Sequence, residues 1–407
     1  MPTTEVRTEK KKKTWTRGRH KVITELARWI LTPYIKWKYG VKVEKFHQQE
    51  DRPYLILLNH QTVFDQFFVG MSFRGPVYYV ATEDIFSLGW ISDLIRYAIA
   101  PIPIRKQTTD ARAVMCCIQV AREGGTIAIA PEGNRTYHGK TVSMNPAIAA
   151  LAKKLKLPIA LYRIEGGYGV QPRWSDGTRK GTMRAGVSRV IQPEEYEKLT
   201  NEELYRQIRA GLDVNEAALS GIYRHKALAQ YLERAIYVCP DCGLSVFESA
   251  GDLIRCKTCG KQVRYLPTKE LEGVDSPVPF RFVADWYEYQ CDFVNKLDLG
   301  DYIREPMYRD QAKVSQVLVF HKKQELWPWT EVCLYGDRIV IDREQVLPFQ
   351  EIYAAAVLGR NKLNIYHKDR IYQIKGGKRF NALKYVNIYH RYKNSSKGEP
   401  YGEFLGL

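Results

Sequence analysis

The stretch YLILLNHQTVFD, residues 54–65, establishes the architecture of the N-terminal half of the chain. Its first five residues form an unbroken apolar run, which is typical of a strand buried on both faces of a parallel sheet. A short polar segment with His60 follows, and apolar residues then recur at helical spacing from Val63 to Met71. The pattern predicts strand, loop and helix, and it places His60 at the carboxyl end of a strand, where open α/β sheets bind ligands.

Similar apolar runs alternate with helical stretches further along the chain, at Val77–Ala81, Ile102–Ile104, Thr126–Ala130 and Ile159–Ile164. This alternation predicts an α/β domain with a mixed sheet flanked by helices. Thr200, with Glu203 three residues later, predicts the N-cap of a closing helix that extends towards residue 220. We therefore expect one domain over residues 21–220.

The N-terminal segment is strongly basic. Residues 1–20 include Lys10 to Lys13, Arg17 and Arg19 and have little apolar surface, which predicts a disordered basic arm. From Lys21 the apolar residues Val22, Leu26, Trp29, Ile30 and Tyr34 recur at helical spacing, which predicts a basic amphipathic helix. Such a helix suits a membrane surface, although packing against the domain is the alternative.

His60 and Asp65 are the first candidate catalytic pair. With His60 in the loop and Asp65 in the first helical turn, the carboxylate is able to accept a hydrogen bond from one ring nitrogen. The other nitrogen then remains free to take a proton from a substrate hydroxyl, as the histidine does in Ser-His-Asp catalysis. The alternative is a strand-end histidine bonded to the backbone and a first-turn acid favoured by the helix dipole.

A second polar block, Pro131 to Thr136, follows the strand Thr126–Ala130. Gly133 permits close backbone approach, and Arg135 offers a planar fork that matches phosphate oxygens. Glu132 either accepts from a polyol hydroxyl or holds the arginine. Arg105 and Lys106, after the strand Ile102–Ile104, add two cations.

Together these segments resemble the acyltransferase family that includes the 1-acylglycerol-3-phosphate acyltransferases. His60 and Asp65 match its His-x4-Asp block, and Pro131 to Arg135 match its Pro-Glu-Gly-x-Arg block; the resemblance covers about residues 40–200. The chain departs from the family pattern at Lys106, where arginine is usual, and at Asn145-Pro146, which replace the common Lys-Gly.

The resemblance implies transfer of a fatty acyl group from acyl-CoA or acyl-ACP, the acyl thioester donor, to the hydroxyl of a lysophospholipid acceptor. The expected reaction converts 1-acylglycerol 3-phosphate to phosphatidic acid. His60 is then the general base oriented by Asp65. Glu132, Gly133 and Arg135 bind the glycerol-phosphate portion, with Arg105 or Lys106 assisting.

Four of the eight cysteines form two C-x-x-C pairs, Cys239/Cys242 and Cys256/Cys259, each followed by glycine. This spacing predicts a tetrahedral thiolate site for a structural Zn²⁺, within a zinc ribbon over residues 236–266. Two disulfides or a rubredoxin-like iron site are the alternatives. Metal binding is expected to supply much of the folding free energy of so short a segment.

The C-terminal region follows a proline-rich segment, Pro267 to Pro279, that we interpret as a linker. Over residues 280–400 the pattern predicts a mainly β domain closed by a helix from about Asn381 to Tyr392. Its expected strands are Val317–His321, Val332–Tyr335, Arg338–Asp342, Leu363–His367 and Ile371–Ile374. The arrangement faintly resembles a PH-like or GRAM-like barrel. This domain and the ribbon are candidates for binding a protein partner.

The net charge of +17 indicates an anionic partner. No apolar window is long enough to span a bilayer and no signal peptide is evident, so we expect a cytoplasmic protein with reduced thiols, held peripherally on the inner face of the membrane. Two rival functions are a basic zinc-ribbon protein that binds nucleic acid and a non-catalytic lipid-binding scaffold. The nucleic-acid hypothesis leaves the two polar blocks unexplained, and the scaffold leaves His60 and Asp65 unexplained.

Overall fold

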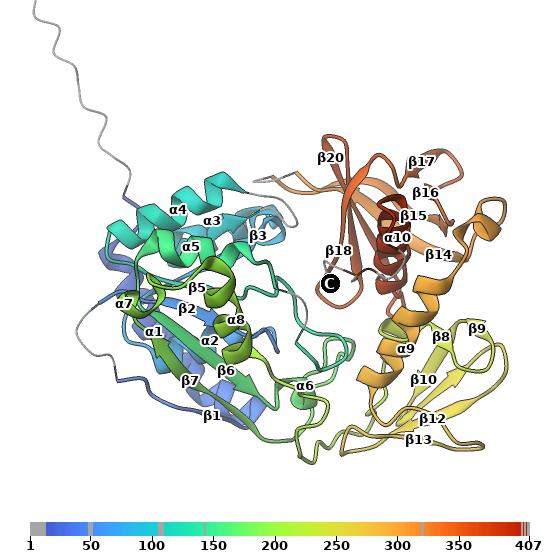
Figure 1. The fold of residues 1–407 in the computed structure, drawn as a ribbon, viewed down its shortest axis with the longest axis horizontal. Helices are drawn as coiled ribbons and strands as arrows, with labels where there is room; N and C mark the ends of the chain where they lie inside the picture. The colour runs from blue at the N-terminus through green and yellow to red at the C-terminus, as the bar shows by residue number, and fades with distance from the viewer. Residues whose placement is uncertain are drawn as a thin grey trace, which may run out of the picture.

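The computed structural model describes residues 14–47, 52–104, 110–141, 144–318, 321–399, 402 and 404. It forms an N-terminal α/β domain, a small cysteine-bearing ribbon and a C-terminal antiparallel β half-barrel (Figure 1). Lys10 to Lys13, Arg105 and Lys106 lie outside the described residues. None of the described helices is both long enough and apolar enough to cross a membrane.

The N-terminal domain contains a seven-stranded sheet in the order β1-β7-β6-β2-β5-β3-β4. Its strands are β1 (Val41–Val43), β2 (Leu55–Leu58), β3 (Val77–Thr82), β4 (Ile102–Ile104), β5 (Thr126–Ile129), β6 (Ile159–Glu165) and β7 (Met183–Ile191). Strands β6, β2, β5, β3 and β4 are parallel, whereas β7 runs antiparallel to β6. The predicted mixed α/β sheet is confirmed. The short β1 and the charged β7 were not predicted.

Helices cover both faces of this sheet. They are α1 (Gly18–Tyr39), α2 (Asp65–Ser72), α3 (Trp90–Ile99), α4 (Ala111–Arg122), α5 (Ala147–Leu155), α6 (Gly167–Val170), α7 (Pro193–Tyr196) and α8 (Asn201–Leu212), with a 3-10 turn, η1 (Glu83–Ser87). Leu55 and Leu57 face a core shared with α4, α5 and α8, whereas Ile56 and Leu58 face a core shared with α1 and α2. The apolar run at 54–58 thus serves both layers, as a strand buried on both faces must.

Two predicted helices have different boundaries in the structure. The capping box between Thr200 and Glu203 is present, but α8 ends at Leu212 rather than near residue 220. Helix α1 already begins at Gly18, inside the segment expected to be an arm, and Trp15 and Thr16 donate backbone hydrogen bonds to Glu123. Part of the basic segment is therefore ordered against the domain.

The ribbon contains the strands β8 (Val238–Cys239), β9 (Gly243–Leu244), β10 (Phe247–Ala250), β11 (Leu253–Cys256), β12 (Gln262–Tyr265) and β13 (Leu271–Gly273), after a 3-10 turn, η2 (Leu232–Arg234). Strand β13 lies within the segment that we interpreted as a linker, and it pairs with β12. The Lys269 ammonium group is buried and donates to the carbonyl oxygens of Glu216 and Leu219 in the N-terminal domain. This segment is therefore a packed connection and not a free linker.

The C-terminal unit is a seven-stranded antiparallel sheet in the order β17-β16-β15-β14-β20-β19-β18. Its elements are α9 (Val283–Lys296), η3 (Leu299–Tyr302), β14 (Tyr308–Gln316), β15 (Gln324–Leu334), β16 (Arg338–Ile341), β17 (Gln345–Pro348), β18 (Ile352–Leu358), β19 (Lys362–His367), β20 (Arg370–Gly376) and α10 (Leu383–Ser396). The mainly β fold with a closing helix is confirmed. The strand expected at Val317–His321 is not found among its described residues, because β14 ends at Gln316 and Val317, Leu318 and His321 lie outside the strands; residues 319 and 320 lie outside the described part of the chain. Helix α9 was not predicted.

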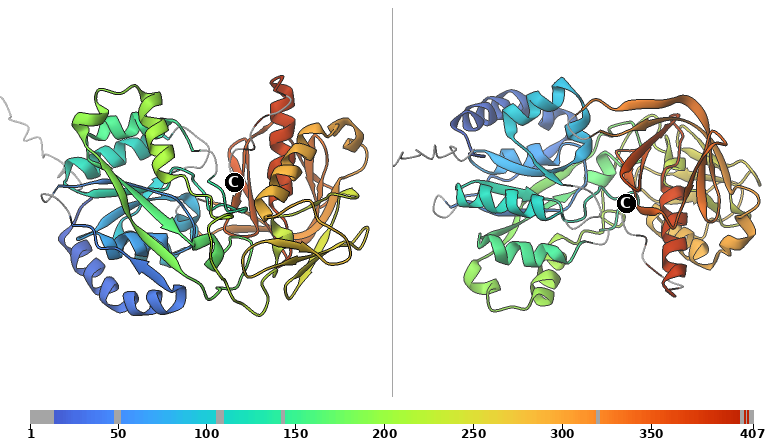
Figure 2. Two further views of the ribbon diagram at one scale, coloured as in Figure 1. Left: turned by 60° about the horizontal axis from the view of Figure 1, so that its bottom comes forward. Right: turned by 90° about the horizontal axis from the view of Figure 1, so that it is seen from above.

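The ribbon and the C-terminal unit share one hydrophobic core. Cys239, Cys256 and Val263 belong to the same buried cluster as Trp286 of α9 and Ile339 of β16. Two further views show the C-terminal helix α10 (red) beside α9 (orange), and α10 also contacts β18 (Figure 2). Tyr137 and Trp174 of the N-terminal domain also belong to this cluster, so the three parts pack as one body.

Candidate functional site

The side chains of His60 and Asp65 are in direct contact. The Nδ1 atom of His60 lies 2.7 Å from Oδ2 of Asp65. The Asp65 side chain is 2% exposed, whereas that of His60 is 30% exposed. Within the described residues no partner is recorded for Nε2 of His60, so the ring presents one engaged nitrogen and one free nitrogen.

The loop between β2 and α2 holds Asp65 in place. Its Oδ2 atom also accepts from the backbone N–H of Gln61 at 2.6 Å, and Oδ1 accepts from the backbone N–H and the hydroxyl of Thr62 at 2.8 and 2.7 Å. Four hydrogen bonds satisfy a buried carboxylate that would otherwise be costly to desolvate. Because an ionised carboxylate only accepts, the proton of the His60–Asp65 contact belongs to Nδ1.

Neighbouring strands fix the position of this loop. The Asn59 side chain exchanges two hydrogen bonds of 2.8 Å with the backbone of Ile164, so it extends the pairing of β2 with β6. On the other side α6 approaches closely, and a Cβ atom at Gly167 would lie 2.4 Å from Cβ of Gln61. Asn59 and Gly167 were not predicted as site residues, although Asn59 directly precedes His60 and Gly167 follows the predicted strand Ile159–Ile164 closely in the sequence.

Glu132 connects the second polar block to His60. Its Oε1 atom accepts from the backbone N–H of His60 at 3.0 Å, and the residue is buried. This contact joins the loops after β2 and β5, and the expected role of Glu132 towards a polyol hydroxyl or Arg135 stays a prediction. Gly133 has a φ of +70°, a conformation that favours glycine, and it is exposed at the turn.

Arg135 is buried, and its Nη1 atom has no hydrogen-bond partner among the described residues. Burial lowers its pKa, and the positive charges of Arg173 and Arg360 lower it further, whereas the nearby carboxylate of Asp65 raises it. A buried cation beside two others is unfavourable unless an anion joins it. The arrangement therefore suits an anionic ligand close to the His60–Asp65 pair.

Three further side chains near this site had no sequence signal. Arg173 donates to the carbonyl oxygens of Arg135, Val357 and Gly359 at 2.7, 2.9 and 2.7 Å. Arg360 comes from the turn between β18 and β19 in the C-terminal unit. Tyr39, at the end of α1, receives a hydrogen bond from Gln171, and the charges of Arg135 and Arg360 both act on its hydroxyl group.

The four predicted metal ligands lie together. The Sγ atoms of Cys239, Cys242, Cys256 and Cys259 all lie within 4.8 Å of one another. Two of the separations, Cys239–Cys259 and Cys242–Cys256, are 3.6 Å. Tetrahedral thiolates at a Zn–S distance of about 2.3 Å would be about 3.8 Å apart, so the donor set and its spacing fit a closed structural metal site.

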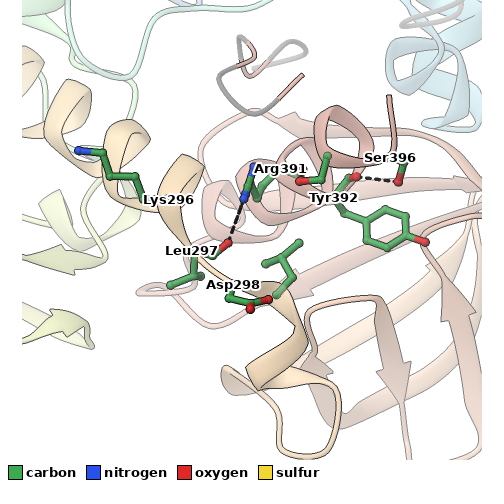
Figure 3. A pocket seen from close by; sticks show the side chains of 8 residues that line it. Lys296, Leu297, Asp298, Arg391, Tyr392 and Ser396 are labelled. Carbon is green, nitrogen blue, oxygen red and sulfur yellow. Dashed lines mark hydrogen bonds between the residues drawn. The ribbon is translucent and has the colours of Figure 1, made fainter. Parts of the chain in front are cut away.

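A shallow pocket elsewhere lacks comparable chemistry. It has a volume of about 610 Å³ and lies where the end of α9 meets α10, between residues such as Leu297 and Tyr392 (Figure 3). Its lining contains no histidine or cysteine, and the Arg391 guanidinium there is engaged by the carbonyl oxygen of Leu297. The candidate catalytic chemistry therefore lies at the ends of β2 and β5.

Comparison with known proteins agrees with these features. Residues 40–164 match the family model described as Acyltransferase, and residues 232–267 match a zinc-ribbon model described as DNA directed RNA polymerase, 7 kDa subunit. The chain is 21% identical over 173 residues to the chloroplastic 1-acyl-sn-glycerol-3-phosphate acyltransferase of Arabidopsis thaliana, which covers 40% of this chain. It thus spans about half (47%) of the length of the plant enzyme.

A solved structure also aligns with part of the chain. The 1-acyl-sn-glycerophosphate (LPA) acyltransferase PlsC from Thermotoga maritima is 20% identical, with a TM-score of 0.41, over 48% of this chain and 80% of that protein. The family match covers both polar blocks, His60 to Asp65 and Pro131 to Arg135. Over residues 40–164, the chain carries a domain of the acyltransferase family.

Proposed function

We propose that this protein transfers a fatty acyl group from a thioester to the hydroxyl group of a lysophospholipid, most simply 1-acylglycerol 3-phosphate, to give phosphatidic acid. The contact between the buried carboxylate of Asp65 and Nδ1 of His60 carries the proposal. It leaves Nε2 of a partly exposed histidine available as a base, and no serine or cysteine nucleophile is required.

The proposed reaction is a direct transfer. Nε2 of His60 takes the proton of the acceptor hydroxyl as its oxygen bonds to the thioester carbonyl carbon. The carbon–sulfur bond then breaks, and the leaving thiolate takes a proton from His60. Asp65 is a positioning residue that holds the ring in the productive tautomer and stabilises the imidazolium. Both acyl-CoA and acyl-ACP fit this scheme as donors.

Arg135 is the proposed anchor of the acceptor phosphate. Its unpartnered Nη1 and its lowered pKa support this role, because a phosphate restores both a hydrogen-bond acceptor and a counter-charge. Gly133 lets the turn backbone come close to the glycerol-phosphate portion, and Glu132 keeps this turn beside His60. Arg105 and Lys106 remain proposed assistants.

An anionic membrane surface is the proposed place of action, at the cytoplasmic inner face. The apolar side chains of α1 that were expected to form one face are exposed, among them Trp29 at 79%. Helix α3 packs beside α1 and exposes more of them, including Trp90 at 74% and Leu94. Aromatic and aliphatic side chains beside the exposed Lys21 and Lys36 suit the headgroup boundary of an anionic bilayer.

The Cys₄ site is proposed to hold zinc in a structural role. Four thiolates without an open position match structural rather than catalytic zinc sites. The ribbon's likeness to a polymerase subunit supports a zinc-binding fold for this segment. The likeness assigns no nucleic-acid role to this chain. Protein partners of the ribbon and of the C-terminal unit remain a hypothesis.

Thiol release from acyl-CoA in the presence of lysophosphatidate tests the reaction. We expect turnover by the wild type and a loss of at least a thousandfold in His60→Ala, with unchanged thermal stability. His47→Ala is the matched control, because His47 is an exposed histidine of the same domain. Equal rates for His60→Ala and wild type would overturn the mechanism. Lipid binding without turnover by the wild type would favour the scaffold.

Co-sedimentation with vesicles tests the surface. At low salt we expect the wild type to sediment with vesicles that contain phosphatidylglycerol. The double variant Trp29→Ala/Trp90→Ala should stay mostly in the supernatant. Trp329→Ala is the control, because Trp329 is an exposed tryptophan of the C-terminal unit. Equal loss of binding in the control and the double variant would contradict the assignment.

A further inference from the structure

The turn between β18 and β19 of the C-terminal unit is attached to the acyltransferase domain through its backbone. The Tyr137 hydroxyl donates to the carbonyl oxygen of Arg360 at 2.7 Å. Arg173 donates to the carbonyl oxygens of Gly359 and Val357. The same guanidinium group donates to the carbonyl oxygen of Arg135. One side chain thus joins this turn to the loop that carries Arg135.

The Arg360 side chain takes no part in these backbone contacts, and it is incompletely paired. Its Nε atom is buried without a hydrogen-bond partner in the described part of the chain. Its Nη1 atom lies 3.3 Å from Oδ1 of Asp176, an atom that also accepts from Arg234 at 2.7 Å. Asp176 therefore serves two cations, and its shorter contact is with Arg234.

Arg360 and Arg135 are close enough to interact. The charge of Arg360 contributes to the lowered pKa of Arg135, after burial and Arg173. The charges of Arg135 and Arg360 also act together on the hydroxyl group of Tyr39. Arg173 differs from both, because its Nε, Nη1 and Nη2 atoms all donate to oxygen atoms of the protein. Within the described residues, Nη1 of Arg135 and Nε of Arg360 are buried donors without a hydrogen-bond partner.

We propose that Arg360 is a second binding residue for the phosphate group of the acyl acceptor, so that the C-terminal unit completes the acceptor site of the acyltransferase domain. The inference rests on the proposed function. A phosphate monoester has three terminal oxygens and about two negative charges, and two guanidinium forks from separate loops match it better than one. Binding also removes the repulsion between the two cations.

The phosphate groups of coenzyme A share this chemistry, but the acceptor is favoured. Arg360 interacts with Arg135, and Arg135 lies within the electrostatic reach of Asp65, the partner of His60. A phosphate held there belongs to the molecule whose hydroxyl group meets His60. The donor places its thioester, and not its nucleotide, at that position.

Equilibrium binding, which does not depend on turnover, provides the first test. A water-soluble short-chain lysophosphatidate and the corresponding monoacylglycerol are titrated against wild type, Arg360→Ala, Arg360→Lys and Arg343→Ala. Arg343 is an exposed arginine between β16 and β17, at the opposite edge of the same sheet. It controls for the loss of one charge from the unit.

We expect Arg360→Ala to weaken lysophosphatidate binding about tenfold, which corresponds to about 1.4 kcal/mol, and to leave monoacylglycerol binding unchanged. Arg360→Lys should recover part of this loss because it keeps the charge without the fork. In the thiol-release assay Arg360→Ala should raise KM for lysophosphatidate, whereas kcat and the KM for acyl-CoA should stay unchanged. Arg343→Ala should match the wild type.

Different failures remain distinguishable. Equal lysophosphatidate affinity in Arg360→Ala and wild type overturns the inference and leaves the acyl transfer intact. A raised KM for acyl-CoA instead assigns Arg360 to the donor and also overturns it. A wild type that binds neither lipid contradicts both this inference and the proposed function. Thermal melting shows whether Arg360→Ala has a folding defect. If it does, Arg360→Lys becomes the test variant, and a lysophosphatidate affinity equal to that of Arg343→Ala overturns the inference.

Discussion

Arg173 donates a hydrogen bond from Nη1 to the carbonyl oxygen of Arg135, at 2.7 Å. The donor lies between α6 and β7, and the acceptor lies in the loop after β5. The same guanidinium group stacks over the Tyr137 ring with 4.3 Å between its central carbon and the ring centroid. The backbone conformation at Arg135 therefore depends on a side chain that is remote in the sequence.

Replacing Arg173 should damage both stability and acceptor binding. Arg173→Ala leaves the carbonyl oxygens of Arg135, Val357 and Gly359 without their donor, and each unsatisfied buried group costs about 1–3 kcal/mol. Arg173→Lys should be nearly as harmful because an ammonium group lacks the planar fork. We expect a lower urea midpoint and weaker lysophosphatidate binding in both variants. A lysine variant that equals the wild type in both would refute this account.

Asp65→Asn should reduce the rate with little effect on the acceptor. An amide in place of the carboxylate can donate to Nδ1 and so stabilises the tautomer that carries its proton on Nε2, where the base must be free. We expect kcat to fall about 10³- to 10⁴-fold, as when the corresponding carboxylate of a Ser-His-Asp triad is lost. Lysophosphatidate affinity should stay within a factor of about three of the wild-type value, because Asp65 makes no direct contact with the proposed phosphate-binding residues. A wild-type kcat would show that Asp65 does not orient His60.

The main α/β elements were predictable because each strand forms an apolar run, and β2, β5 and β6 are buried along most of their length. β2, β3, β4, β5 and β6 each appear at the predicted positions. β7 escaped because the exposed charged residues Arg184 and Arg189 interrupt its apolar positions. α9 had a usable signal, since Val283, Trp286 and Val294 recur at helical spacing and are buried.

The candidate site was predictable only where it is local. His60 and Asp65 lie in one strand–loop–helix unit, so their contact follows from chain geometry within a few residues. The arrangement around Arg135 depends on Arg173 and Arg360, which reach it through packing between distant segments. No motif or periodicity marks such residues, because a turn of a β hairpin carries no signal for what it docks against. Long-range packing is what the single sequence left undetermined.

His138 should make stability fall in acid. Burial lowers its pKa from 6.5 to about 3, and its ring stacks on Tyr287 with centroids 4.5 Å apart. Between pH 3 and 6.5 the unfolded chain binds a proton that the folded protein does not, so acid favours unfolding in this window and the contribution is regained above it. The slope is at most about 1.4 kcal/mol per pH unit. His138→Gln should flatten the pH dependence of the urea midpoint between pH 4 and 6. An unchanged slope would contradict the assignment.

Removing the metal should destabilise more than the ribbon. The sequence alone suggested that the metal supplies much of the folding free energy of the ribbon over residues 236–266. However, Cys239 and Cys256 lie in one core with Trp286, and the Trp286 indole donates to the carbonyl oxygen of Val238 at 2.8 Å. Losing the tetrahedral site therefore loosens the packing of α9, and α9 packs against α10.

We expect chelation or Cys256→Ser to lower the melting temperature of the whole protein and to change tryptophan fluorescence. Metal analysis should find about one zinc per chain in the wild type and little in this variant. Cys116→Ser is the control, because Cys116 lies in α4 outside the cluster. Unfolding confined to the ribbon, with α9 protected from hydrogen exchange, would show that the shared core does not depend on the metal. Because Tyr287 of α9 stacks on His138 in the loop after β5, loss of the metal should also weaken lysophosphatidate binding.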